Sequence, residues 1–215
     1  MTKTFIQITD SHIDDDKLVM GVDSQANLGA IVSVISQKNY DALLISGDLA
    51  HNGTLESYQI LQKILDPIET EIYVLPGNHD DLSNLSQVFN KSYLCNFTID
   101  CWEVITIDSV QAGKVSGRLS DEQLYSLSQE IRSSSAKYIV LCLHHPPVSM
   151  QSDWDDEMSL ENPEDLFAVI DQYDNIKAVM WGHAHQSTVF NRNGVKLFSC
   201  PVSYTHLTLP TNSRV

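Results

Sequence analysis

The chain has 215 residues, of which 28 are acidic and 13 are basic, for a formal net charge of -15. A chain of this length suits one globular domain around a single hydrophobic core. The negative charge would repel a polyanion, so we expect no nucleic-acid partner. No apolar run approaches the roughly 18 residues of a membrane helix, and no signal segment is visible, so we expect a cytoplasmic protein with no membrane partner.

Strands and helices are predicted to alternate in the first part of the chain. Short apolar runs rich in β-branched residues predict strands at residues 5–9, 42–46, 72–75, 102–107, 138–143 and 178–181. Apolar side chains at positions i, i+3, i+4 and i+7 predict a helix around residues 28–35, and a similar stripe, interrupted by the polar Gln62, predicts one around residues 58–65. These helices would connect successive strands.

The later part of the chain adds helices and a hairpin. Ser120 begins a capping box and predicts a helix start, and a further helix is expected from Asn162 to about Tyr173. The pair Asn193-Gly194 between two β-prone runs is the strongest short signal for a hairpin. Together these elements predict an α/β fold of two packed, mixed sheets flanked by helices.

The last segment, residues 202–215, differs from the rest of the chain. It is polar and unpatterned, and it resembles the translation of a transposon-end sequencing adapter. We therefore expect one domain over residues 1–201, truncated at its C-terminal end, and a loosely packed non-native tail over residues 202–215. A native flexible tail is the alternative.

Five short polar motifs each follow a predicted strand. They are Asp10-Ser11-His12, Gly47-Asp48, Gly77-Asn78-His79-Asp80, His144-His145-Pro146 and Gly182-His183-Ala184-His185. Because α/β folds bind ligands at the carboxyl ends of their strands, we expect the motifs to converge. One histidine in such a place is usually an ordinary loop residue, but six of the eight histidines lie in these motifs, so that explanation fails for the group.

The spacing and the residue types favour metal binding. In Asp-x-His and His-x-His, the period-two alternation of an extended chain places both donors on one side. Asp, His and Asn supply oxygen and imidazole donors without thiolate. Such donors fit a Mn, Fe, Zn or Co site better than they fit a structural zinc site, which is rich in thiolates. The pattern therefore indicates a catalytic metal centre.

The ordered motifs, over residues 10–185, resemble the calcineurin-like metallophosphoesterase superfamily. The stretches QITDSH, ISGDLAHNG, VLPGNHD and LHHPP, with Ser152-Asp153-Trp154-Asp155 in the following loop, are most similar to the bacterial 3',5'-cyclic-AMP phosphodiesterases. This resemblance implies the layered metallophosphoesterase β-sandwich and a hydrolase that opens 3',5'-cyclic AMP to 5'-AMP. The implied nucleophile is a hydroxide that bridges two metal ions, with Fe and Mn expected first and Zn or Co as alternatives.

The resemblance also assigns roles residue by residue. The first ion is expected to be held by Asp10, His12 and His185. The second ion is expected to be held by Asn78, His144 and His183. Asp48 would bridge both, since a carboxylate has two oxygens. Contacts with the substrate are expected from His12, Asp48, Asn78, His79 and His185.

His79 is expected to act as the general acid that gives a proton to the departing ribose oxygen, while Asp80 orients and charges its ring. A supporting role of His79 around the ligands is the alternative. His145 is expected to be structural, because it follows His144 and would point to the opposite face of the strand.

Four features stay open. His51 could touch the substrate or be an exposed loop residue, and Asn52 stands where these enzymes often carry an acid. The acidic run at residues 14–16 predicts a solvated loop, with metal recruitment as the alternative. Trp154 could stack on an adenine or pack into the core.

Two other functions are open at this point. A phosphodiesterase or phosphomonoesterase of broader specificity would use the same metals. A metal-retaining scaffold would bind proteins without turnover, although the intact His79 and Asp80 argue against it. A small cyclic nucleotide is the expected partner, and the oligomeric state is left open.

Overall fold

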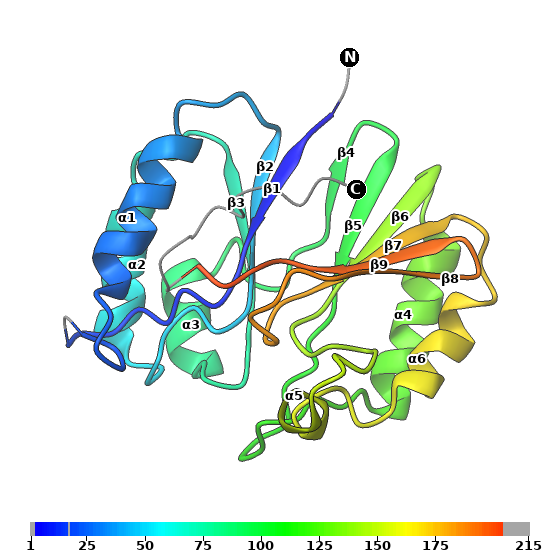
Figure 1. The fold of residues 1–215 in the computed structure, drawn as a ribbon. Coiled ribbons are helices and arrows are strands. Elements are labelled where there is room, and N and C mark those ends of the chain that lie inside the picture. Colours follow the sequence, from blue (N-terminus) through cyan, green and yellow to red (C-terminus); the bar gives the residue numbers. More distant parts are fainter. Residues whose placement is uncertain (1–2, 17, 204–215) are drawn as a thin grey trace, which may run out of the picture.

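Two β-sheets pack face to face, and helices cover the outer side of each (Figure 1). The computed structural model describes residues 3–16 and 18–203. One sheet has three strands and the other six. The expected α/β architecture of packed sheets flanked by helices is therefore confirmed.

The three-stranded sheet is entirely parallel and has the strand order β1-β2-β3. Its strands are β1 (Phe5–Ile8), β2 (Ala42–Ser46) and β3 (Glu71–Leu75). The helices on its outer side are α1 (Ser24–Ile35), α2 (Leu55–Leu65) and α3 (Leu82–Phe89). Parallel neighbours need such crossovers, because a tight turn cannot join them.

The six-stranded sheet is mixed and has the order β4-β5-β6-β7-β9-β8. Its strands are β4 (Phe97–Ile99), β5 (Trp102–Thr106), β6 (Tyr138–Cys142), β7 (Ile176–Trp181), β8 (Val189–Arg192) and β9 (Val195–Ser199). Only the outer pairs β4–β5 and β8–β9 are antiparallel. Its helices are α4 (Asp121–Ser133), α5 (Asp153–Glu157) and α6 (Pro163–Ile170).

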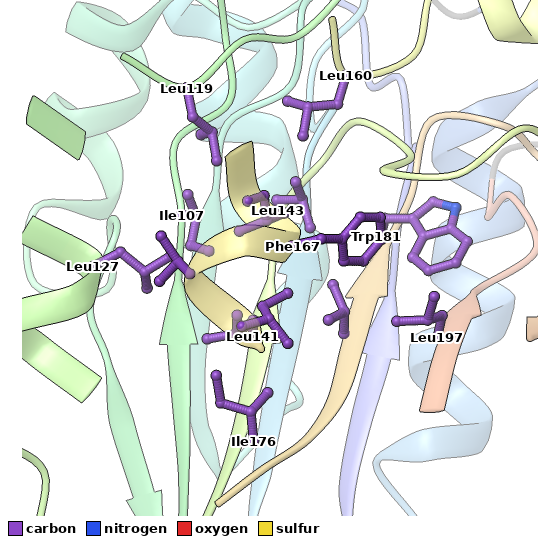
Figure 2. Close-up of a cluster of buried hydrophobic side chains, with 14 of the residues drawn as sticks. Ile107, Leu119, Leu127, Leu141, Leu143, Leu160, Phe167, Ile176, Trp181 and Leu197 are labelled. Carbon is purple, nitrogen blue, oxygen red and sulfur yellow. The ribbon is translucent and has the colours of Figure 1, made fainter. Parts of the chain in front are cut away.

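Apolar layers lie on both sides of each sheet. Every residue of β2 is buried: Leu43 and Ile45 pack with the helices, while Ala42 and Leu44 pack against the other sheet. This explains why β2 reads as a continuous apolar run. Behind the larger sheet, Leu141 packs with side chains from α4 and α6 (Figure 2).

Several predicted boundaries agree with the structure. Ser120 caps α4 with a complete capping box, and Asn193 and Gly194 form the turn of the β8–β9 hairpin. The helix expected to reach Tyr173 ends at Ile170 instead, because the following amides bond three residues back, as in Tyr173 N–H to the Ile170 carbonyl at 3.1 Å. The short elements β4, α3 and α5 were not predicted.

The start of the supposed foreign tail is packed. Val202 and Ser203 are buried, and Ser203 exchanges two hydrogen bonds with the backbone of Thr9, its N–H donating at 3.0 Å and its hydroxyl accepting at 3.2 Å. Loose packing from Val202 onward is therefore wrong for these two residues. The rest of the predicted tail, residues 204–215, lies outside the described residues. In the described part, no helix combines the length and hydrophobicity that crossing a bilayer requires.

Candidate metal site

The predicted metal ligands come from loops at the carboxyl ends of strands in both sheets (Figure 1). The loops after β1, β2 and β3 carry Asp10, His12, Asp48 and Asn78, and those after β6 and β7 carry His144, His183 and His185. Gln7 of β1 ties the sheets together at this end, because its amide donates to Ser46 Oγ at 2.7 Å and to the Trp181 carbonyl at 3.2 Å. The strand ends of both sheets thus meet at one place.

The first predicted ligand set comprises Asp10, His12 and His185, whose potential ligand atoms lie within 4.8 Å of one another. Asp10 Oδ1 is 3.3 Å from His185 Nε2 and 4.0 Å from His12 Nε2. Burial opposes ionisation of Asp10, but the hydrogen bond with His185 and the charge of His144 outweigh burial and lower its pKa. An ionised carboxylate beside two imidazoles suits a divalent cation.

The second predicted ligand set comprises Asn78, His144 and His183. His144 donates from Nδ1 to the Ser46 carbonyl at 2.9 Å, and its Nε2 lies 3.2 Å from His183 Nδ1. Burial lowers the pKa of His183 to about 4, which keeps its ring neutral at pH 7. Burial also opposes the charge on His144, but Asp48 outweighs it and raises the pKa of His144 to about 9. A metal ion would have to displace that proton.

Asp48 lies between the two ligand sets. Its Oδ1 is 3.4 Å from His144 Nε2, and its Oδ2 is 3.7 Å from His12 Nε2. Burial disfavours the carboxylate, but His144 and His12 outweigh that effect and hold the pKa of Asp48 well below its usual range. Its two oxygens thus face different ligand sets, as a bridging carboxylate requires.

Unsatisfied buried atoms support metal binding here. Asn78 Oδ1 and His183 Nε2 are both buried without a hydrogen-bond partner. A buried polar atom left in this way costs about 1–3 kcal/mol, so such atoms need an explanation, and a bound cation provides one. The clustered aspartate and histidine side chains are therefore suited to a binuclear metal site.

Five of the seven predicted ligands have a left-handed backbone. The φ angle is 53° at Asp10, 42° at His12, 50° at Asp48, 64° at His183 and 52° at His185. The explanation by alternation along an extended chain is therefore wrong, although both donors of each motif do reach the site. This conformation costs a non-glycine residue on the order of 1–3 kcal/mol, and such strain gathers at functional sites.

Two glycines allow the ligand loops to approach one another. A Cβ atom at Gly77 would collide with Asp48, and one at Gly182 would collide with Thr9 and come within 2.9 Å of Asp10. The glycines of the two motifs are therefore required by close packing around the carboxylates.

His79 is fixed beside the ligands with its side chain exposed. Its backbone N–H donates to Asp48 Oδ1 at 2.9 Å, and its ring Nδ1 lies 2.9 Å from the His51 carbonyl. The ring stacks on that of His51 at 5.2 Å and meets that of His12 edge-on at 4.8 Å. Because a carbonyl only accepts, Nδ1 carries a hydrogen there, and Nε2 is left to exchange a proton with a ligand.

Asp80 is not the group that orients the His79 ring, contrary to expectation. Its carboxylate accepts bonds of 2.8–3.1 Å from the backbone N–H groups of Leu49, Ala50 and Gly77 and from the Tyr58 hydroxyl. Burial, together with the charge of Asp48, raises the pKa of Asp80 to about 6. Asp80 therefore joins the loop after β2 to the loop after β3, and the His51 carbonyl orients the ring.

A pocket of about 350 Å³ contains the exposed parts of these side chains. Its polar lining comes from His12, Asp48, His51, Asn78, His79, His183 and His185. Its apolar lining comes from Val19, Met20, Val115, Trp154 and Met158. A larger hollow of about 550 Å³ beside α2 and α3 has none of the predicted ligands in its lining. The smaller pocket is therefore the candidate functional site.

Comparison with known proteins identifies the family. The family described as calcineurin-like phosphoesterase matches residues 3–187. The chain belongs to this family. A protein of Vesicomyosocius okutanii named "Probable cyclic nucleotide phosphodiesterase" is 50% identical over 201 residues, which cover 94% of this chain and 86% of that protein. The "3',5'-cyclic adenosine monophosphate phosphodiesterase CpdA" of Pseudomonas aeruginosa is 31% identical over 202 residues, which cover 91% of this chain and 74% of that one.

Solved structures share the fold of this phosphoesterase. A dimetal phosphatase from Danio rerio superimposes with a TM-score of 0.76 at 13% identity, covering 94% of this chain and 88% of that chain. A Plasmodium protein described as "GAP50 the anchor in the inner membrane complex" gives 0.65 at 12% identity, covering 92% and 70%. The fold alone therefore does not separate an enzyme from an anchoring protein.

The structure places His51, Asn52 and the acidic run at residues 14–16, which the sequence left open. His51 lines the pocket, and Asn52 donates to Asp14 Oδ2 at 2.5 Å. Asp14 is buried, so the prediction of a solvated acidic loop is wrong at this position. An acid at position 52 would face the Asp14 carboxylate, whereas the amide of Asn52 satisfies it.

His145 and Trp154 are also placed. His145 is buried, with Nδ1 2.8 Å from Ser109 Oγ and Nε2 3.1 Å from the Val115 carbonyl, so both ring nitrogens already have protein partners. Trp154 is exposed and lines the pocket instead of the core. Nothing in the sequence pointed to Met20 or Met158, because single methionines in loops carry no recognisable spacing.

Proposed function

We propose that this phosphoesterase hydrolyses 3',5'-cyclic AMP to 5'-AMP. The relatives named as cyclic nucleotide phosphodiesterases support the substrate. The observation that carries the reaction is the position of His79, whose side chain is exposed in the pocket, whose backbone N–H is held by Asp48 and whose ring is held by the His51 carbonyl. A ring held in this way suits proton donation.

Two bound cations would supply an activated water and neutralise charge on the phosphate. Fe and Mn are the first candidates, with Zn and Co as alternatives, because the donors are oxygen and imidazole. One ion would be held by Asp10, His12 and His185. The other would be held by Asn78, His144 and His183. Asp48 would serve both through its two oxygens.

The chain and the solvent together account for the proton balance. The bond between phosphorus and the ribose 3'-oxygen breaks, the hydroxyl group of water joins phosphorus while the remaining proton of that water goes to solvent, and His79 gives the 3'-oxygen a proton that it regains from solvent. Asp80 keeps the His79 loop in register with the Asp48 loop through its bonds to both. The substrate is expected to contact His12, Asp48, Asn78, His79 and His185.

One assay tests the function. Protein loaded with Mn is offered cyclic AMP, cyclic GMP, bis(p-nitrophenyl) phosphate and p-nitrophenyl phosphate. We expect the highest kcat/KM for the cyclic nucleotides and 5'-monophosphates as products. Preference for p-nitrophenyl phosphate would indicate a phosphomonoesterase, and no turnover of any of the four by metal-loaded protein would indicate a scaffold.

A further inference from the structure

Exposed apolar side chains gather at the mouth of the site. Among the described residues, eight large hydrophobic side chains are exposed, and three of them, Met20, Val115 and Trp154, line the metal-site pocket. Met20 is 82% exposed and Trp154 is 70% exposed. Apolar surface gathered beside polar ligands marks a place where a partly apolar ligand binds.

The exposure of Trp154 is fixed by the residues that follow it. The Asp155 carboxylate accepts from Gln186 Nε2 at 3.0 Å, which ties α5 to the loop that carries His185. The Asp156 carboxylate accepts from the Ser149 hydroxyl and the Met150 N–H, both at 2.6 Å. The helix is thus anchored on both sides while the indole stays outside the core.

Met158 lies four residues after Trp154 and lines the same pocket. Residues at i and i+4 lie on the same face of a helix. One face of the segment that begins with α5 therefore presents an indole and a thioether to the pocket.

Met20 is presented by a tight turn. Val19 and Val22 exchange backbone hydrogen bonds of 2.9 Å, and the two residues between them, Met20 and Gly21, have φ angles of 49° and 83°. Turns of this type prefer Asn or Gly at both central positions, so Met at the first is unfavourable locally. An exposed side chain in an unfavourable conformation indicates a role outside folding.

We propose that Trp154 and Met20 hold the nucleobase of the substrate, with the base stacked on the indole and in contact with the thioether. This inference rests on the proposed function, because it names the part of the substrate that the metal ligands do not bind. A flat aromatic ring suits both side chains, since indole stacks on bases and thioether sulfur contacts aromatic rings favourably.

The apolar lining also defines the selectivity. Apart from the indole N–H, the side chains of Val19, Met20, Val115, Trp154 and Met158 offer no strong hydrogen-bonding group. Stacking without hydrogen bonds accepts every base, because each has a π-face. Cyclic AMP and cyclic GMP should therefore differ by less than about tenfold in kcat/KM.

The main test compares substrates with and without a base. For cyclic AMP, Trp154→Ala should raise KM by about 5- to 150-fold, which corresponds to roughly 1–3 kcal/mol of stacking, while Trp154→Phe should keep most of the affinity. For the base-free ribose 3',5'-cyclic phosphate, Trp154→Ala should leave KM unchanged. Tyr125→Ala, which removes an aromatic ring of similar exposure (68%) on α4, is the matched control and should change neither. Equal effects of Trp154→Ala on both substrates would overturn the proposal, as would no effect on cyclic AMP.

Met20→Asn tests the second side chain, because it should leave stability unchanged or raised while it weakens substrate binding. Asn suits the turn, so the unfolding midpoint should stay the same or rise, while KM for cyclic AMP should increase by about 2- to 13-fold through loss of the sulfur–aromatic contact. An unchanged KM would remove Met20 from the base site.

A measurement of nucleotide binding distinguishes this inference from the proposed function. Trp154 is far more exposed than the fully buried Trp181, so 5'-AMP added to Mn-loaded protein should quench its fluorescence, and the quenching should be lost in Trp154→Phe. If cyclic AMP is not hydrolysed but this quenching is present, the function fails and the base site stands. If cyclic AMP is hydrolysed without any effect of the Trp154 substitutions, the base site fails and the function stands.

Discussion

The two sheets contribute different chemistry to the site. The loops after the three-stranded sheet carry every predicted oxygen ligand, namely Asp10, Asp48 and Asn78, together with the imidazole of His12. The loops after the six-stranded sheet carry only imidazoles, from His144, His183 and His185. Each predicted ligand set takes residues from both sheets, so the centre forms only when the sheets are correctly packed, and bound metal should couple the stability of one sheet to that of the other.

Loss of the shared carboxylate should have the largest effect. Asp48→Ala should abolish turnover and the binding of both ions, because the oxygens of Asp48 face the two ligand sets separately. Elemental analysis of the purified variant measures this directly. Asn78→Ala is the matched control and should lose only one ion. Two ions retained by Asp48→Ala would rule out the bridging role.

The second largest effect is expected from loss of the proposed proton donor, His79. His79→Ala should keep both ions and lose about 10²- to 10⁴-fold in kcat for cyclic AMP, since the leaving ribose oxygen needs a proton. The loss should be much smaller with bis(p-nitrophenyl) phosphate, because p-nitrophenolate leaves without one. Equal losses on both substrates would show that His79 does not donate the proton.

Metal removal should weaken the packing of the sheets. At an ion concentration of about 100 times Kd, one bound ion stabilises the folded state by about 2.7 kcal/mol, which corresponds to roughly 5–11 °C in Tm for a chain of this size. Thermal unfolding after chelation, with and without added Mn, measures the shift. An unchanged Tm would mean that the ions do not bind the folded protein more tightly than the unfolded chain.

The smallest effect is expected from removing the Tyr58 hydroxyl, which supports the loops after β2 and β3. The Tyr58 hydroxyl donates to Asp80 Oδ1 and accepts from the Asp81 N–H, both at 2.9 Å. Tyr58→Phe should therefore cost about 1.5–3 kcal/mol of unfolding free energy and lower kcat while both ions stay bound. Tyr173→Phe, which removes a hydroxyl bonded to Ser128 on α4, is the control: it should lower stability without changing kcat. If both variants leave kcat unchanged, Asp80 has no positioning role.

The strands and the candidate ligands could be recognised in the sequence because both leave local patterns. Apolar runs such as residues 42–46 mark strands buried on both faces, and the motifs after them supply the donors. The partners of Asp80 could not be predicted. Tyr58 lies 22 positions away, and the apolar stripe of its helix predicts that Tyr58 is buried but does not predict which group its hydroxyl bonds. The exposure of Trp154 depends on anchoring by Gln186, a contact between distant loops.

The left-handed backbone at Asp10, His12, Asp48, His183 and His185 sets a condition for transplanting this site to another scaffold. A designer who placed Asp-x-His and His-x-His on regular extended strands would aim the donors along directions different from those found here. The turns themselves, with the glycines at positions 77 and 182 that make room for them, would have to be copied as backbone fragments. For design, the portable unit is the set of five loops that carry the predicted ligands, three of them with a left-handed backbone, and the ligand residues are only a part of it.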